Sequence, residues 1–297
     1  MAFRESQAAY RSCRSRRLTT RAEVAAAFCD THGHKFIGPV GAGAFKETFH
    51  IVFATGEAQA LKVYQPGFSS ERTGRELSAM QRCSHPNIGR LNAIENFAYK
   101  GVQYLLSLEE FLSGGTLTSR IATGVLSPAE TIDIGRQLVS AVGHIASLEL
   151  VHRDLKPDNI LFRGDGATPV IVDFGLVRDL VGTSLTETWH MRGPGTPFYA
   201  PPEQLRNEKA MIDWRADQFS LGVVLAISAL GIHPYQEDGN TPTQTVELVA
   251  NRGQQVVRFL EAATKSNFPF LIRMTAPWPV ERFRTPDELR RAWQETN

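Results

Sequence analysis

The most informative run in the sequence is His152-Arg153-Asp154-Leu155-Lys156-Pro157-Asp158-Asn159, and Asp173-Phe174-Gly175 follows it along the chain. The first stretch combines carboxylate, ammonium and amide side chains, which are groups of a reaction centre rather than of a core. Val170-Ile171-Val172 lies between the two stretches and has the β-branched composition of a buried strand. We therefore expect a rigid strand to position the Asp173 carboxylate.

These residue types match what phosphoryl transfer requires. Its transition state is loose and highly charged, so an enzyme mainly positions the reactants and neutralises charge. The reaction needs a carboxylate near the attacking hydroxyl, a cation near the transferred phosphate, and oxygen ligands for Mg²⁺, which binds few protein groups. Asp154, Lys156, Asn159 and Asp173 supply these groups.

The two stretches resemble the motifs of the eukaryotic-type Ser/Thr protein kinases, and the resemblance extends from about residue 36 to the end of the chain. It implies that Asp154 accepts or orients the proton of a substrate hydroxyl. It also implies that Asn159 and Asp173 hold Mg²⁺, with Mn²⁺ as an alternative. Lys156, two residues after Asp154, resembles the Ser/Thr form of the loop rather than the tyrosine kinase form.

The segment Val40-Gly41-Ala42-Gly43 resembles the glycine-rich loop that covers the phosphates of ATP. Glycine lets the backbone approach phosphates and offer its N–H groups. The resemblance places Val40, Gly41 and Gly43 against the nucleotide. Lys46 replaces the third glycine of the family, and it either adds a cation near the phosphates or points to solvent.

Lys62, in Ala60-Leu61-Lys62-Val63, resembles the strand lysine that contacts the α- and β-phosphates, and Ala60 belongs to the same nucleotide site. A lysine between apolar neighbours in a strand is costly to bury unless it is paired. By the resemblance its partner is Glu76, nine residues before His85-Pro86, and Glu71 is the rival.

The run Glu110-Phe111-Leu112-Ser113-Gly114-Gly115 resembles the hinge, where backbone groups of Glu110 and Leu112 would pair with adenine. The residue before the hinge, the gatekeeper, is then Glu109. A charged gatekeeper is unusual in the family, so a register shifted by one, with Leu108 facing the nucleotide, stays open.

A later segment indicates a protein substrate. The run from Gly195 to Glu203 resembles the end of the activation segment, in which Thr196 bonds the catalytic Asp and Lys. Glu203 is expected to pair with Arg282, and Asp217 to hold the backbone of the catalytic loop. Hydroxyls between residues 179 and 192 are either sites of activating phosphorylation, possible through autophosphorylation, or ordinary loop residues.

The resemblance and the residue patterns together predict an α+β, bilobal protein-kinase fold with ATP in the interlobe cleft. Residues 1–35 form a basic arm and a short helix, with Thr20 as N-cap and Gly33 at its end. Residues 36–110 form an N-lobe with an antiparallel sheet and one helix over 71–83. Residues 113–297 form a mostly helical C-lobe, with helices over 128–148, over 217–230 and from 243 onward.

Net charge, apolar runs and cysteine count indicate the classes of partner and the cellular location to expect. The net charge of +1 does not favour nucleic acid or an acidic membrane, and no apolar run is long enough to span a bilayer. Cys13, Cys29 and Cys83 are too few and too scattered for a disulfide framework or a zinc site. We expect a cytoplasmic protein without nucleic-acid or membrane partners, and the oligomeric state stays undetermined.

Three functions compete. The first is an active Ser/Thr kinase that uses ATP and Mg²⁺ on protein substrates. The second is a kinase-fold binding or scaffold module with weak or no catalysis, for which Lys46 and Glu109 are the supporting features. The third is a kinase of small metabolites, against which the segment from Gly195 to Glu203 argues.

Overall fold

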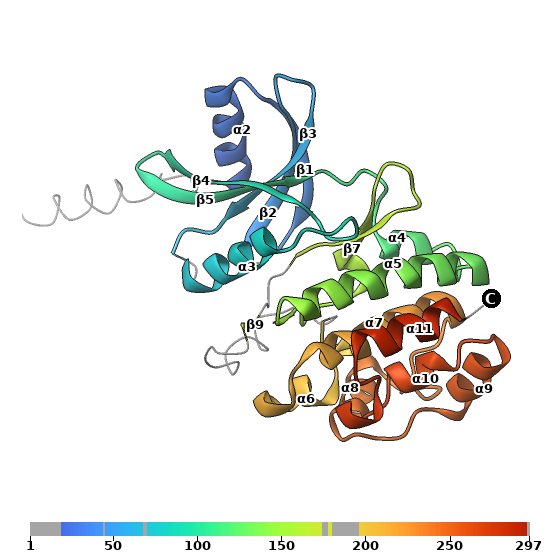
Figure 1. Ribbon diagram of the computed structural model, residues 1–297. Helices are drawn as coiled ribbons and strands as arrows, with labels where there is room; N and C mark the ends of the chain where they lie inside the picture. Colours follow the sequence, from blue (N-terminus) through green and yellow to red (C-terminus); the bar gives the residue numbers. More distant parts are fainter. Residues whose placement is uncertain (1–18, 44, 68–69, 174–177, 180–195, 296–297) are drawn as a thin grey trace, which may run out of the picture. The chain divides into compact units, whose positions relative to one another are not determined.

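The computed structural model describes residues 19–43, 45–67, 70–173, 178–179 and 196–295 (Figure 1). Residues 1–18 of the expected basic arm and residues 180–192 of the expected phosphorylation segment lie outside the described residues. The chain divides into two compact units. Unit 1 comprises Met1–Phe68 and Ala93–Glu109, and unit 2 comprises Ser69–Asn92 and Glu110–Asn297.

Unit 1 is built on a five-stranded sheet with the order β1-β2-β3-β5-β4. β1 pairs antiparallel with β2, and β2 pairs antiparallel with β3. Lys100 (φ 50°) and Gly101 (φ 80°) connect the last two strands, and two positive φ values are typical of the tight turn of a β-hairpin. The strands are β1 (Lys35–Ala42), β2 (Lys46–Val52), β3 (Ala58–Tyr64), β4 (Leu91–Tyr99) and β5 (Val102–Glu110).

The predicted N-terminal helix is confirmed as α2 (Arg21–His32), which packs on the sheet of unit 1 (Figure 1). Thr20 caps it as predicted: its hydroxyl accepts the Glu23 N–H at 3.2 Å, and the Glu23 carboxylate accepts the Thr20 N–H at 2.9 Å. Gly33, at φ 69°, ends the helix in the left-handed region.

The two faces of this sheet differ in character because side chains alternate along each strand. Leu61 and Val63 of β3, and Leu106 and Leu108 of β5, belong to the apolar cluster that α2 covers. Lys62 lies between Leu61 and Val63 and therefore points to the opposite face. The sheet therefore has one apolar face, which α2 covers, and an opposite face that carries Lys62.

Unit 2 is mostly helical, and its predicted helices are confirmed with ends that move by a few residues. In Figure 1, α5 runs beside α7 and α11. The helices are α3 (Ser70–Arg82), α4 (Leu117–Ile121), α5 (Pro128–Ser147), α6 (Pro202–Leu205), α7 (Trp214–Leu230), α8 (Pro242–Ala250), α9 (Val257–Lys265), α10 (Phe270–Met274) and α11 (Pro286–Gln294).

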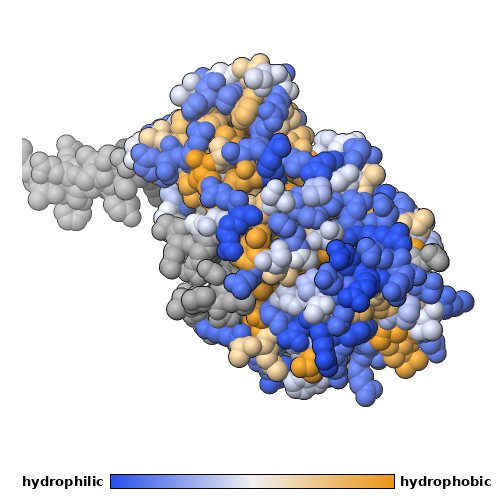
Figure 2. Space-filling model, in the orientation of Figure 1, coloured by the Kyte–Doolittle hydropathy of each residue, from blue (hydrophilic) through white to orange (hydrophobic). Residues whose placement is uncertain are grey.

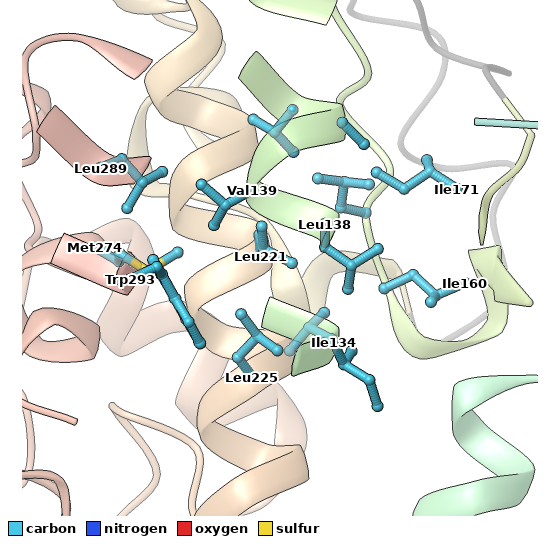
Figure 3. Packing of buried hydrophobic residues seen from close by; sticks show 14 of the residues in the cluster. Ile134, Leu138, Val139, Ile160, Ile171, Leu221, Leu225, Met274, Leu289 and Trp293 are labelled. Carbon is cyan, nitrogen blue, oxygen red and sulfur yellow. The ribbon is translucent and has the colours of Figure 1, made fainter. Parts of the chain in front are cut away.

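The core of unit 2 lies where α5, α7, α10 and α11 meet, and Figure 3 shows its packing. Gly135 of α5 permits the closest approach, because a Cβ atom there would lie 2.0 Å from the ring of the fully buried Trp293. The labelled core side chains are Ile134, Leu138, Val139, Ile160, Ile171, Leu221, Leu225, Met274, Leu289 and Trp293.

Short strands and 3₁₀ turns of unit 2 flank the predicted site residues. β7 (Ile160–Phe162) pairs antiparallel with β8 (Pro169–Ile171), and β6 (Leu150–Val151) pairs antiparallel with β9 (Arg178–Asp179). The predicted strand before Asp173 is therefore confirmed as β8. The 3₁₀ turns are η1 (Pro157–Asn159), η2 (Thr196–Tyr199), η3 (Lys209–Met211) and η4 (Pro279–Glu281).

The visible surface in Figure 2 is mostly hydrophilic, with small and separate hydrophobic areas. Among the described residues, no helix combines the length and the apolar character needed to cross a bilayer. The large apolar side chains that are exposed are Ile37, Val40, Val102, Val125, Met211, Val257, Trp278 and Val280.

Candidate active site

The catalytic loop is anchored by Asp217, a buried carboxylate in the first turns of α7. Its Oδ2 accepts the His152 backbone N–H at 2.7 Å, and its Oδ1 accepts that of Arg153 at 2.8 Å. Burial raises the pKa of Asp217, while these two bonds oppose the rise. The anchor fixes a backbone that is unusual at Arg153, where φ is +68°. The expected role of Asp217 is confirmed.

Three of the predicted site residues meet at the side chain of Asp154, which is buried. The Lys156 Nζ lies 3.3 Å from Asp154 Oδ2. The Asn159 amide N–H₂ donates to the same Oδ2 at 3.1 Å and to the Asp154 backbone carbonyl at 2.8 Å. The loop therefore holds a carboxylate, an ammonium and an amide in one cluster.

The backbone of Val172, the residue before Asp173, is bonded to the catalytic loop. The Val172 N–H donates to the Asn159 carbonyl at 2.9 Å. The Val172 carbonyl accepts from His152 Nε2 at 3.1 Å, since His152 Nδ1 already accepts the Asp154 N–H at 3.3 Å. Asp173 comes next, with φ +61°. Phe174 and Gly175 lie outside the described residues.

The donor set fits a Mg²⁺ site of the kind that phosphoryl transfer uses. The Asn159 NH₂ group is bonded to Asp154, which leaves its carbonyl oxygen as the ligand atom, and Asp173 offers a carboxylate. Oxygen ligands few in number are what Mg²⁺ requires when phosphate oxygens and waters complete its shell. The described part of the chain contains no cluster of three or more His, Cys, Asp or Glu side chains suited to a metal.

The segment after the catalytic loop is fixed to unit 2 by two buried contacts. Glu203 accepts both Nη groups of Arg282, at 2.6 and 3.0 Å, which confirms the predicted pair. The Gln204 amide donates to the Arg153 carbonyl at 2.8 Å, a contact that the sequence analysis missed. Thr196 begins η2, and its side chain lies outside what the structure describes.

The glycine-rich segment lies at the end of β1. Val40 is exposed, and Gly41 stands opposite Thr48 of β2. The Gly43 N–H donates to the Lys46 carbonyl at 2.9 Å, which closes the turn. The Lys46 ammonium lies 5.7 Å from the ring centroid of Tyr64. It therefore packs over an aromatic face rather than simply pointing to solvent.

Lys62 forms an ion pair that the sequence analysis did not predict. Its ammonium lies 2.6 Å from Glu109 Oε2, and both side chains are only 6% exposed. Leu108 is buried in the cluster under α2, so of the two gatekeeper alternatives it is Glu109 that shares a face with Lys62. The signal in the sequence is the alternation of Tyr104, Leu106 and Leu108 with Ser107 and Glu109. The side chain of Glu76, on α3, lies outside the described residues, so the predicted Lys62–Glu76 pair stays a prediction.

Glu110, the expected hinge residue, is the last residue of β5. Its carboxylate makes a further contact that the sequence did not indicate. Arg163 donates to its two carboxylate oxygens, at 2.7 and 3.2 Å. The Gly114 N–H donates to the Phe162 carbonyl at 2.9 Å, and a Cβ at Gly114 would lie 2.2 Å from the Arg163 carbonyl. Leu112 is buried between these anchors. The run from Glu110 to Gly114, the expected hinge, is thus fixed on β7 and Arg163.

Comparison with known proteins places these motifs in a family. Residues 34–293 match the protein kinase domain family. The chain is 32% identical to CBL-interacting serine/threonine-protein kinase 26 of Arabidopsis thaliana, over 87% of this chain and 58% of that protein. It is 29% identical to CBL-interacting serine/threonine-protein kinase 15 of the same plant, over 86% of this chain and 59% of that protein.

The chain is also similar to a bacterial protein. The probable serine/threonine-protein kinase PknB of Lactococcus lactis is 32% identical over 69% of this chain and 32% of its own length. The chain thus spans about three fifths of the plant relatives and a third of the bacterial one. The matched range contains the Asp154 cluster, Asp173 and the Glu203–Arg282 pair. The chain therefore belongs to the protein kinase domain family.

Proposed function

We propose that this chain is an ATP-dependent protein kinase that transfers the γ-phosphoryl group to serine or threonine hydroxyls of protein substrates. The observation that carries the proposal is the cluster at Asp154, where Lys156 and Asn159 both contact the same carboxylate oxygen. Asp173 follows a residue whose backbone is bonded to that loop on both sides. This arrangement supplies base, cation and metal ligands together.

The roles follow from the chemistry of the groups. Asp154 takes or orients the proton of the attacking hydroxyl, and Lys156 contacts the same carboxylate. Lys156 reaches the transferred phosphate and offsets charge that develops on it. Mg²⁺, which Mn²⁺ can replace, would be held by Asn159 and Asp173, and when bound it neutralises the phosphate oxygens. Thr196 would orient the acceptor beside Asp154 and Lys156.

The nucleotide contacts belong to the same proposal. Backbone N–H groups at Gly41 and Gly43 would contact the phosphates, Val40 and Ala60 would contact the adenine, and a backbone group of Leu112 would pair with the adenine edge. The Lys62 ammonium would bind the α- and β-phosphates. Glu76 would support this lysine from α3, and the backbone of Glu110 would pair with the adenine edge.

The type of acceptor residue, the protein substrate and the cellular location are inferred from separate features. Lys156 and Thr196 favour serine and threonine acceptors, and the printed names of the relatives point the same way. The Glu203–Arg282 anchor, which fixes the segment that would receive a peptide, favours a protein substrate. A cytoplasmic location is also part of the proposal, since Cys29 and Cys83 are free thiols.

The test is incubation of the purified chain with [γ-³²P]ATP, Mg²⁺ and a generic basic protein, followed by identification of the labelled amino acids. We expect phosphoserine and phosphothreonine but no phosphotyrosine. Binding of MgATP without transfer would instead support the scaffold module, and label on a small alcohol but on no protein would support a metabolite kinase. Mass mapping of the same sample tests autophosphorylation, which we expect between residues 179 and 192.

A further inference from the structure

The face of the unit 1 sheet that carries Lys62 contains a polar network, and the roles above use only its lysine. Glu109 Oε2 bonds the Lys62 ammonium at 2.6 Å, and Glu109 Oε1 accepts the Ser107 hydroxyl at 2.8 Å. The Ser107 hydroxyl lies 3.4 Å from the hydroxyl of Tyr64. All four residues come from the neighbouring strands β3 and β5. The network is therefore internal to one sheet.

Hydrogen bonds to both oxygens fix the Glu109 carboxylate in place, in addition to its proximity to the Lys62 ammonium. Each oxygen of Glu109 has its own hydrogen-bond donor, and Ser107, two residues earlier on the same face, is fully buried. A buried charged pair is stable when its remaining lone pairs are satisfied in this way. The ammonium of Lys62 has three donor hydrogens, so its contact with Glu109 is compatible with phosphate contacts as well.

We propose that Glu109 is a positioning residue that holds the Lys62 ammonium for the phosphates of the nucleotide, so that this position is set within unit 1. The inference rests on the proposed function, in which Lys62 binds the phosphates. It differs from the expectation that α3 supplies the main counter-ion through Glu76. Glu109 then acts through Lys62 and need not touch the nucleotide.

The test compares the affinity for MgATP, measured by calorimetry, in variants of the full chain. E109Q removes the charge and keeps the shape. Loss of a charge-assisted hydrogen bond that positions Lys62 should weaken MgATP binding by about 10- to 100-fold. E109D keeps the charge and should lie between wild type and E109Q. E57Q is the matched control, because Glu57 is an exposed glutamate of the same unit that accepts from the Gln59 amide at 2.7 Å, and its affinity should stay within about twofold.

A kinetic measurement separates positioning from a purely structural role. In E109Q the KM for ATP should rise more than kcat falls, and the KM for the protein substrate should not change. E76Q is the comparator, and we expect its KM for ATP to rise less than that of E109Q. An E109Q variant with wild-type affinity for MgATP, or an E76Q variant more impaired than E109Q, would overturn the inference.

Thermal unfolding covers the case in which E109Q is poorly folded. Because the two side chains form an ion pair, E109L should lower the Tm by leaving Lys62 buried without this counter-ion, and K62M/E109L should recover part of the loss. Strictly additive Tm changes would contradict the pairing. A wild-type chain that binds MgATP but transfers no phosphate would remove the proposed function and leave the affinity comparison valid.

Discussion

Arg282 and Glu203 lie 79 positions apart and form a bidentate ion pair, with Nη1 2.6 Å from Oε1 and Nη2 3.0 Å from Oε2. Both side chains are fully buried. The guanidinium also donates to the Ala276 carbonyl at 2.8 Å and stacks 4.8 Å from the ring centre of Phe219. The pair joins the segment that follows η2 to the late helices of unit 2.

Removal of one partner should be costly. R282A leaves Glu203 as an uncompensated buried carboxylate, and we expect it to lower the free energy of unfolding by about 3–5 kcal/mol. R290A breaks an exposed pair with Asp287 and should cost at most about 1 kcal/mol. Urea denaturation of both variants measures the difference. Equal losses in the two variants would show that the buried pair does not hold this segment.

Asp217 should matter for rate more than for binding. In D217N only one amide oxygen faces the N–H groups of His152 and Arg153, and the new NH₂ group opposes the other donor. Loss of one bond to a charged acceptor corresponds to about 10- to 100-fold in kcat. D238N changes a carboxylate that is 87% exposed and should leave kcat intact. A D217N variant with wild-type kcat would refute the anchoring role.

The stability of the fold should depend on pH through His233. Its Nδ1 accepts the Tyr235 N–H and its Nε2 donates to the Phe198 carbonyl, so the folded state holds the ring neutral. Burial lowers the pKa of His233 to about 4, while an unfolded histidine titrates near about 6.5. The unfolded state binds more protons between these values, so the free energy of unfolding falls as the pH falls from about 6.5 to about 4.

The measurement is urea denaturation of wild type and H233Q. Between about pH 7 and about pH 5, wild type should lose about 2 kcal/mol more than H233Q. H233Q is expected to be less stable throughout, so the informative quantity is the slope with pH. Parallel slopes would mean that His233 does not titrate as its contacts indicate.

Two glycines of α5 should respond in opposite ways to alanine. At Gly135 a Cβ would meet the Trp293 ring at 2.0 Å, so G135A should destabilise the fold by about 1–3 kcal/mol through overpacking. At Gly143 the nearest atom would be Pro286 Cβ at 3.5 Å, an ordinary contact. G143A should therefore gain up to about 1 kcal/mol from helix propensity. Thermal unfolding checks both, and the same sign for the two variants would contradict the packing described.

Much of the fold was predictable from local signals. The cap at Thr20 and the stop at Gly33 bound α2 because capping depends only on neighbouring residues. The strand before Asp173 and the helices α5 and α7 follow from apolar periodicity. The Glu203–Arg282 pair was predictable only through the family resemblance, since nothing local links residues so far apart in the chain.

The contacts that sequence analysis missed depend on tertiary placement. Arg163 reaches Glu110, and Gln204 reaches the Arg153 carbonyl, across separations that no periodicity encodes. The partner of Lys62 depends on which face β5 presents, and a shift of one residue would exchange Leu108 with Glu109. The apolar face under α2 fixes that choice.

The most direct test of the account is the initial rate of phosphoryl transfer from ATP to a protein in D154N, with D165N as control. Asp165 is an exposed carboxylate that accepts hydrogen bonds from Ala167 N–H and from the Thr168 hydroxyl in the turn between β7 and β8. Because a positioned base contributes about 10²- to 10⁴-fold, D154N should lose that factor while MgATP binding persists, and D165N should keep the wild-type rate. Transfer by D154N at the wild-type rate would contradict the assignment of the active site.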